Sequence, residues 1–297
     1  MKRIFIKMKL TLLSLILITL MSCNESRQSN YKADNLIEFD TIIVSDRYHL
    51  EGDTAKPYCD ISVEFVYPVV SERTNLDTLQ QFFVSNMFGA SFESFSPEIA
   101  VESYVKNYIE NYSQDADMYR EIAEDINSFS ELTSDVIVSE SDHSFYSYYE
   151  SLSDSIVYNK YKVLSFQVKQ SNNKRGTVAT YISYSNFVYN LISGKQITEN
   201  EIFNPGYDLA LQSLIITSLL EQNNVKSIEE LEELGFFGIT EIVPNSNFLL
   251  NEDGIIYTFN KGEYSAYQLD APEVFIPYKA VRSLLIDNTV VSNLADL

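Results

Sequence analysis

Few residues of this chain have the side-chain types that usually carry out chemistry. The 297 residues include two cysteines and two histidines, namely Cys23, Cys59, His49 and His143. These four do not have the close spacing of a zinc site, and nothing in the sequence places a third group beside either histidine to complete a catalytic triad. The sequence also has no phosphate-binding loop, no His-Glu-x-x-His and no Gly-x-Ser-x-Gly. We therefore expect no catalytic residue, no metal site and no cofactor, with both histidines solvated.

Acidic side chains are numerous, but their spacing favours helix surfaces over a binding site. Glu229, Glu230, Glu232 and Glu233 follow Ser227, which has the position of a helix N-cap. Acids in the first turns of a helix are stabilised by the helix dipole and face water. A second acidic segment, residues 114–125, lacks the glycine and the spacing of a calcium loop. We interpret both clusters as solvated helix faces.

The N-terminal region has the pattern of an export signal that ends at a cysteine. Residues 1–9 carry four basic residues and no acid, and residues 10–21 form an apolar segment shorter than a membrane span. The series Leu20-Met21-Ser22-Cys23 resembles the bacterial lipobox, in which a peptidase cleaves before a lipidated cysteine. We expect residues 1–22 to be a removed signal peptide and Cys23 to carry acyl chains that anchor the protein to a membrane. The alternatives are an ordinary secretory signal with an incidental cysteine, and a membrane-tethering helix.

This anchor predicts a location outside the cytoplasm, at the cell envelope, either at the outer membrane or on the periplasmic face. The short polar tail after Cys23 is similar to that of Bacteroidetes-type lipoproteins. If Cys23 carries lipid, Cys59 has no partner and no internal disulfide can form. We interpret Cys59 as a buried small hydrophobic residue and not as a nucleophile, because it begins a predicted strand.

The formal net charge is −21, from 42 acidic and 21 basic residues. A chain of this charge repels phosphate backbones, which argues against nucleic acid as a partner. Acidity can simply keep a protein soluble, and it can also select basic partners. The 21 tyrosines and 18 phenylalanines, with no tryptophan, favour a fold rich in strands.

The periodicity of apolar residues predicts an α+β fold with helices packed on antiparallel sheet. Residues 23–57 are interpreted as a polar tether, and the first folded half is placed at residues 58–159. In that half we expect a strand at 58–70 and helices over 74–89 and from Pro97 onward. Three strand segments at 132–151, 155–170 and 176–193 then predict a long antiparallel meander.

The second half is placed at residues 160–297. Apolar spacing predicts helices at 207–222 and 227–235 and a hairpin at 245–260 that turns at Asp253-Gly254. A strand at 274–276 and a helix at 278–286 follow. We see no long glycine- or proline-rich linker, so the two halves are expected to share a core or a tight interface.

Three segments of the second half resemble a known family when taken in order. They are "FVYNLISGKQITENEIFNPG" (187–206), "NSNFLLNEDGIIYTFN" (245–260) and "GEYSAYQLDAPEVFIPYKAVRSLL" (262–285). Together they resemble the extracytoplasmic domain of unknown function that is found in the lysozyme-sensing anti-sigma factor RsiV and the peptidoglycan deacetylase PdaC. The matching positions include the Ser193-Gly194-Lys195 turn, Tyr264, Tyr267 and Ile276-Pro277-Tyr278.

This resemblance implies a lipid-anchored binding or sensing module without catalysis, for a basic protein such as lysozyme or for peptidoglycan. It makes Tyr264, Tyr267 and Tyr278 candidates for a recognition surface, although paired aromatics are more often core residues. The alternatives are an accessory domain of an envelope hydrolase or deacetylase, and a purely structural lipoprotein. The hydrolase alternative predicts that acids and His143 meet in one pocket.

Overall fold

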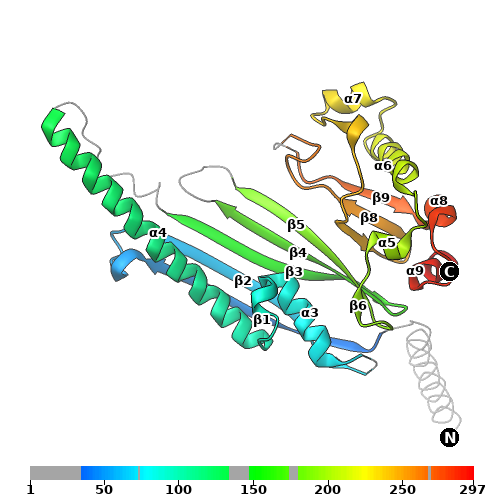
Figure 1. Cartoon of the computed structure of the whole chain (residues 1–297), viewed down its shortest axis with the longest axis horizontal. Helices are drawn as coiled ribbons and strands as arrows, with labels where there is room; N and C mark the ends of the chain where they lie inside the picture. Colours follow the sequence, from blue (N-terminus) through cyan, green and yellow to red (C-terminus); the bar gives the residue numbers. More distant parts are fainter. Residues whose placement is uncertain (1–34, 73, 134–146, 174–179, 267–268) are drawn as a thin grey trace, which may run out of the picture.

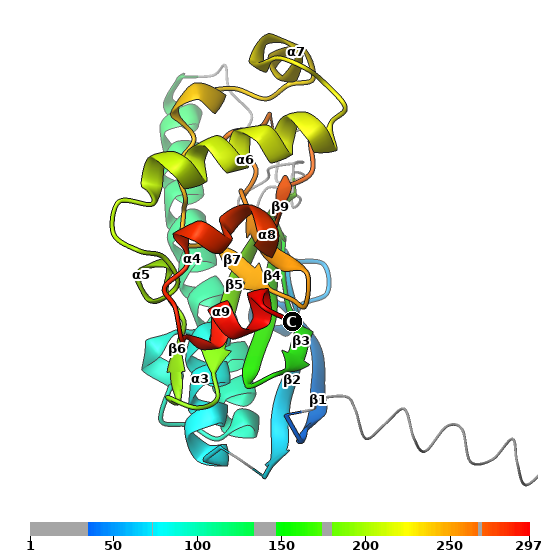
Figure 2. The same cartoon turned by 90° about the vertical axis from the view of Figure 1, so that its right-hand side faces the viewer.

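The structure is a computed structural model, and it describes residues 35–72, 74–133, 147–173, 180–266 and 269–297. The fold is α+β, with a six-stranded sheet, a three-stranded sheet and helices packed on both (Figure 1). The longer sheet and its two helices form an elongated body, and the shorter sheet and its helices lie over one end of it (Figures 1 and 2). The predicted fold class is confirmed.

The six-stranded sheet has its strands in chain order, from β1 at one edge to β6 at the other. Every pair is antiparallel except β2 and β3, which run parallel. The bounds of its strands are β1 Ile37–His49, β2 Tyr58–Ser71, β3 Tyr148–Lys160, β4 Val163–Asn173, β5 Tyr181–Asn190 and β6 Lys195–Gln196. A short 3-10 turn, η2 (Leu50–Gly52), follows β1.

Two helices connect the parallel strands β2 and β3 and cover one face of the sheet. Asn75 caps α3 (Leu76–Phe88), because its side chain accepts a hydrogen bond from the Thr78 N–H at 2.8 Å. After η3 (Ala90–Phe92), the 37-residue helix α4 (Pro97–Thr133) begins at a proline, where the missing N–H has no helical partner to lose. The apolar faces of both helices pack on alternate residues of β2 and β4, including Phe65 and Phe166. This packing forms the first core.

Strands β3, β4 and β5 form a meander, but with other bounds than predicted. Of the first predicted strand, 132–151, residues 132–133 end α4 and residues 134–146 lie outside the described residues. Residues 155–170 form parts of two strands, because the chain reverses at Tyr161 and Lys162. Both residues have positive φ, 53° and 68°, as a two-residue hairpin turn of type I′ requires. Type I′ turns usually contain glycine or asparagine, and neither residue is one of these. The turn was therefore not predicted from the sequence.

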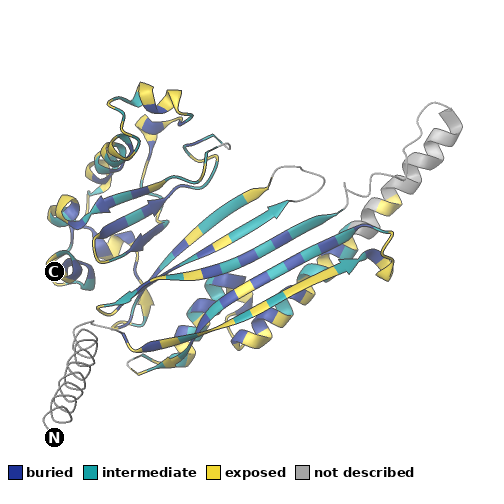
Figure 3. Ribbon diagram, turned by 180° about the vertical axis from the view of Figure 1, so that it is seen from behind, coloured by how far each residue is buried: buried dark blue, intermediate teal, exposed yellow. Residues whose placement is uncertain are grey.

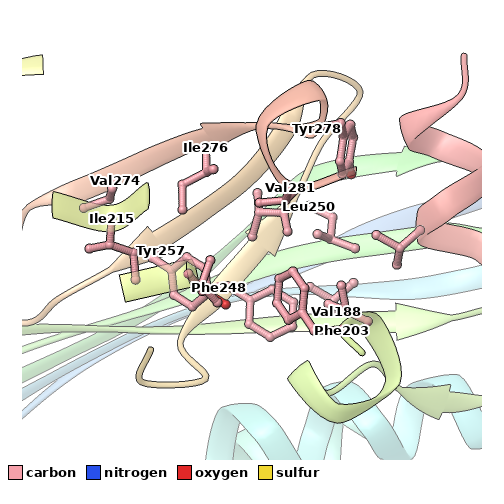
Figure 4. Packing of buried hydrophobic residues seen from close by; sticks show 14 of the residues in the cluster. Val188, Phe203, Ile215, Phe248, Leu250, Tyr257, Val274, Ile276, Tyr278 and Val281 are labelled. Atoms are coloured by element: carbon pink, nitrogen blue, oxygen red, sulfur yellow. The ribbon is translucent and has the colours of Figure 1, made fainter. Parts of the chain in front are cut away.

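The C-terminal elements build the second core around a three-stranded antiparallel sheet. Its strands are β7 (Phe248–Leu250), β8 (Gly254–Thr258) and β9 (Glu273–Pro277), and the predicted hairpin turn at Asp253-Gly254 joins the first two. The surrounding helices are α5 Glu199–Ile202, α6 Asp208–Gln222, α7 Ile228–Glu233, η5 Ile239–Glu241, α8 Tyr278–Val281, η6 Arg282–Leu284 and α9 Val290–Ala295. Figure 4 shows side chains from β5, α6 and this sheet packed together.

The two cores lie on opposite faces of β4 and β5. Leu164 and Tyr189 belong to the core under α3 and α4, whereas their neighbours Val163 and Val188 belong to the C-terminal core. Successive side chains of a strand point to opposite faces, so the same two strands serve both cores. The predicted division at residues 159 and 160 therefore falls within the large sheet, at the β3–β4 hairpin.

The predicted tether also needs correction. Strand β1 lies inside residues 23–57 and pairs along its length with β2. Its polar residues outnumber its apolar ones because it is an edge strand with an exposed face (Figure 3). That composition made the segment look like a linker.

Candidate functional site

The structure describes only some of the residues that the sequence singled out. Cys23, His143 and Tyr267 lie outside the described residues. Tyr278 is 4% exposed and belongs to the C-terminal core, with its hydroxyl donating to the Asn251 carbonyl oxygen at 3.0 Å. Burial raises the pKa of its phenol. A side chain held in this way cannot contact a macromolecular ligand, which corrects the prediction for Tyr278.

Tyr264 is half-buried and packs edge-to-face on Phe259, with ring centroids 5.4 Å apart. It belongs to the periphery of the C-terminal core. The structure therefore favours the packing role for Tyr264 that the sequence also allowed. Tyr264 and Tyr278 do not form a joint surface.

The described cysteine and histidine, Cys59 and His49, are also held by packing and hydrogen-bond contacts within the fold. Cys59 is fully buried, and burial raises the pKa of its thiol to about 12, so it is inert as a nucleophile. Its predicted place in the core is confirmed. The His49 ring packs at a tilt against Tyr58, with ring centroids 5.3 Å apart, and its Nδ1 lies 3.2 Å from the Lys56 carbonyl oxygen. Across the described ranges no three His, Cys, Asp or Glu side chains are grouped as a metal ion would need.

One buried carboxylate has the surroundings of an anchor and not of a catalytic acid. Glu199 is 7% exposed, and its two oxygens accept four hydrogen bonds. The donors are the hydroxyls of Tyr257, Tyr207 and Ser246 and the Ser246 N–H, at 3.0, 3.2, 3.1 and 3.0 Å. Burial together with the Glu199 charge raises the pKa of Tyr207 to about 12. These contacts join α5, β8 and the loop before β7.

A groove of about 630 Å³ runs between the edge strand β1 and the helix α4. Apolar side chains from both elements line it: Ile42 and Val44 from β1, and Val101, Val105 and Ile109 from α4. Val101 and Val105 belong to the core under the sheet, so the groove is an opening onto that core. Val101 and Val105 are themselves buried, so the apolar surface that the groove exposes comes from the half-buried Ile42, Val44 and Ile109.

The rim of the groove is acidic. Asp46, Glu98, Glu102 and Glu110 face a single base, Lys106, which lies 3.8 Å from Glu110. Glu98 is held in place because its carboxylate accepts hydrogen bonds from Ser96 at 2.9 Å and Tyr67 at 3.4 Å. An apolar floor with an acidic rim suits a ligand that presents apolar and basic groups together. This groove is the candidate site.

Sequence reasoning found one wall of this site and missed the other. The helix from Pro97 onward was predicted from its apolar residues, which include Val101. Strand β1 was missed because Thr41, Ile43 and Ser45 leave the alternation of apolar residues incomplete. The run Ile42-Ile43-Val44 within a polar segment was the available signal of a strand.

The two sheets and their helices define a two-part α+β protein with an open groove at one sheet edge. Residues 200–279 match the family model described as "Protein of unknown function (DUF3298)". The crystal structure of a DUF3298 family member from Bacteroides fragilis has a TM-score of 0.75 and 25% sequence identity, covering 90% of this chain and 100% of that one. A DUF3298 family protein from Pseudomonas aeruginosa has a TM-score of 0.58 at 10% identity, covering 86% of this chain and 97% of that one, and shows the shared fold.

No curated protein matches the chain. The DUF3298 match covers the C-terminal body from α5 to the start of α8, and the structural likeness to DUF3298 proteins extends over both sheets. In the described part of the chain, no helix is both long enough and apolar enough to cross a membrane.

Proposed function

We propose that this protein is a lipid-anchored, non-catalytic binding module of the cell envelope, and that it binds a cationic protein in the β1–α4 groove. The anchor is Cys23, and the envelope location follows from the export signal before it. The groove, with its apolar floor and four rim acids, is the observation that carries the proposal.

Three further observations support this function. The net charge of −21 attracts cationic molecules over distances longer than any single contact. The buried tyrosines and Glu199 are used in packing, which leaves the groove as the best-formed candidate surface. The ordered motifs that resemble the RsiV- and PdaC-type domain overlap the DUF3298 match, and that resemblance points to lysozyme as a partner.

Lysozyme is therefore the first cationic protein to test, by titration followed with calorimetry at two ionic strengths. We expect binding that weakens at high salt, because charges at an exposed rim are screened over about 8–10 Å. Lysozyme with succinylated lysines keeps its fold but has the opposite charge, and it should not bind.

A double substitution at the rim tests whether the partner binds in the groove. Replacing both rim acids, Glu98→Gln and Glu102→Gln, should weaken binding by roughly fivefold to thirtyfold, since each exposed charge contributes about 0.5–1 kcal/mol. The matched control, Glu232→Gln with Glu233→Gln on the exposed face of α7, removes the same charge far from the groove and should leave affinity unchanged. Affinity that is insensitive to salt, or retention on insoluble peptidoglycan with no binding of lysozyme, would overturn the proposal.

A further inference from the structure

The main chain of β1 has one side paired with β2 and one side open. In an antiparallel strand, the N–H and C=O of one residue point to one side, and those of the next residue point to the other. The Thr41 N–H donates to the carboxylate of Asp40 at 2.8 Å and so is not part of the β2 ladder. The register is unbroken from Phe39 to His49, which places Ile43, Ser45 and Arg47 on the same open side as Thr41.

On the opposite side of the sheet, the part of β5 that the short edge strand β6 does not cover is closed by side chains. On β5, the Tyr184 N–H donates to the Asn260 side chain at 2.7 Å, and the Tyr184 carbonyl accepts from Asn247 at 3.1 Å and Asn260 at 3.0 Å. The Asn186 N–H donates to the Asn247 side chain at 2.8 Å. Two asparagines thus take the place of a neighbouring strand on β5. On β1, in contrast, the main chain of the open side has one hydrogen-bond partner among the described residues, the side chain of Asp40 within the strand itself.

An open edge beside an apolar groove has the geometry for strand addition. A strand placed beside β1 would direct alternate side chains over Val101 and Val105 of α4, because the sheet would extend across the groove. The rim acids from Glu98 to Glu110 span roughly 18 Å of helix, which corresponds to about five or six extended residues.

The charges on β1 select the kind of chain that can add there. The strand carries Glu38, Asp40 and Asp46, and its single base, Arg47, is paired with Asp60 through two hydrogen bonds. A second copy of this chain would place acids against acids, because the β1 edges would meet. A basic extended segment would instead meet opposite charges from β1 and from the α4 rim.

We propose that the open edge of β1 accepts an extended, basic segment of the partner protein as a seventh strand of the large sheet, with apolar side chains in the β1–α4 groove. This inference rests on the proposed function, and it adds the main-chain mode of recognition. Each hydrogen bond to the odd-numbered residues of β1 adds affinity without regard to the partner's side chains.

The experiment uses a labelled peptide, acetyl-(Lys-Val)4-amide, and the full chain in detergent, with binding read by fluorescence anisotropy. Two matched peptides carry N-methyl groups either on all four lysines or on all four valines. A peptide that adds as a strand directs the N–H groups of only one set toward β1. One methylated form should therefore bind at least about tenfold more weakly than the parent peptide, and the other should bind within about twofold of it.

A pair of protein variants tests the same contact from the other side. Ile43 is 69% exposed and its N–H points to the open edge, so Ile43→Pro removes an edge donor and no β2 bond. Ile43→Thr loses the same side chain but keeps the N–H. Only the proline variant should lose peptide binding.

The outcomes separate this inference from the proposed function. Equal weakening by both methylation patterns, or equal binding by both Ile43 variants, would overturn strand addition while cationic binding in the groove stands. Failure of the parent peptide to bind, with lysozyme still binding in a manner that depends on Glu98 and Glu102, would overturn it as well. Failure of both ligands would overturn the proposed function itself.

Discussion

At the scale of single residues, Asp154 has a buried carboxyl group that forms no ion pair with any of the described basic side chains. It lies on β3 one residue beyond the last parallel pair, Glu64 with Ser153. One carboxyl oxygen accepts the Val66 N–H at 2.6 Å, and the other is buried without a hydrogen-bond partner among the described residues. Burial raises the pKa of Asp154 to about 7, with a smaller contribution from the Glu64 charge.

This pKa has a defined effect on stability. The folded state binds the proton more tightly than the unfolded state, whose pKa is near 4, so the stabilisation is complete below pH 4 and is lost as the pH rises to 7. We expect Asp154→Asn to increase the free energy of unfolding by roughly 2–3 kcal/mol more at pH 8 than at pH 5. Urea unfolding of variant and parent at both pH values measures this difference.

The control is Asp46→Asn, which changes an exposed carboxylate on β1 and should give the same small effect at both pH values. A gain for Asp154→Asn that does not depend on pH would contradict the account, since it would show that the carboxyl group is already neutral or already solvated in the folded protein.

Single residues were predictable from the sequence where their role is local. Ser227 caps α7 as predicted, because its side chain accepts from the Glu230 N–H three residues later. Cys59 is buried as its place in the strand pattern indicated. The burial of Tyr278 was not predictable in the same way, because it depends on packing against strands far away in the sequence.

At the scale of elements, the β3–β4 hairpin contains conformational strain. Tyr161 and Lys162 both have left-handed backbone angles, which are unfavourable by about 1–2 kcal/mol for residues with ordinary side chains. The Lys162 N–H donates to the Asn35 side chain at 2.7 Å, and the Leu191 N–H donates to the Lys162 carbonyl at 2.9 Å. These main-chain contacts hold the turn in place.

Replacing the turn with Tyr161→Asn and Lys162→Gly should stabilise the protein by about 1 kcal/mol. Asn-Gly adopts type I′ turns with little strain, although the freedom of glycine in the unfolded chain offsets part of the gain. The urea midpoint should rise with no change in its slope. The double variant Tyr161→Ala with Lys162→Ala removes the same side chains without relieving the backbone, so a similar gain in that control would show that strain is not the cause.

The elements were predicted well where their own periodicity decides them, as in α3, α6 and the β7–β8 hairpin. Strand β1 and the β3–β4 turn were not, and for one physical reason: both depend on partners that the local sequence does not contain. β1 is a strand because β2 pairs with it, and the turn is tight because Asn35 and Leu191 bind it. The candidate groove was not predicted either, because β1 forms one of its walls.

At the scale of the whole molecule, β4 and β5 belong to both cores. Phe166 packs under α3, and Ser165, the next residue back, exchanges hydrogen bonds with the Leu250 main chain of the small sheet at 2.8 and 3.2 Å. Strands that bury both faces cannot lose one core without exposing half of their surface. We therefore expect the two parts to unfold together.

Calorimetry should show one unfolding transition. Ile255→Ala, which opens a cavity in the C-terminal core, should destabilise the protein by about 2–5 kcal/mol and speed hydrogen exchange in β2, which belongs to the other core. Ile192→Ala removes a side chain that is 64% exposed and should change neither. Two resolved transitions, or exchange in β2 that is unaffected by Ile255→Ala, would show that the cores are independent.

The parallel pairing of β2 with β3 also sets the order in which the chain can fold. Residues 72–147 separate the two strands, so β1 and β2 form a hairpin with two open edges until the whole crossover has been synthesised and β3 arrives. Loop closure over such a distance slows folding. During that interval the acids of β1 repel the same strand of a second copy, so the acidic edge also disfavours aggregation while the chain folds.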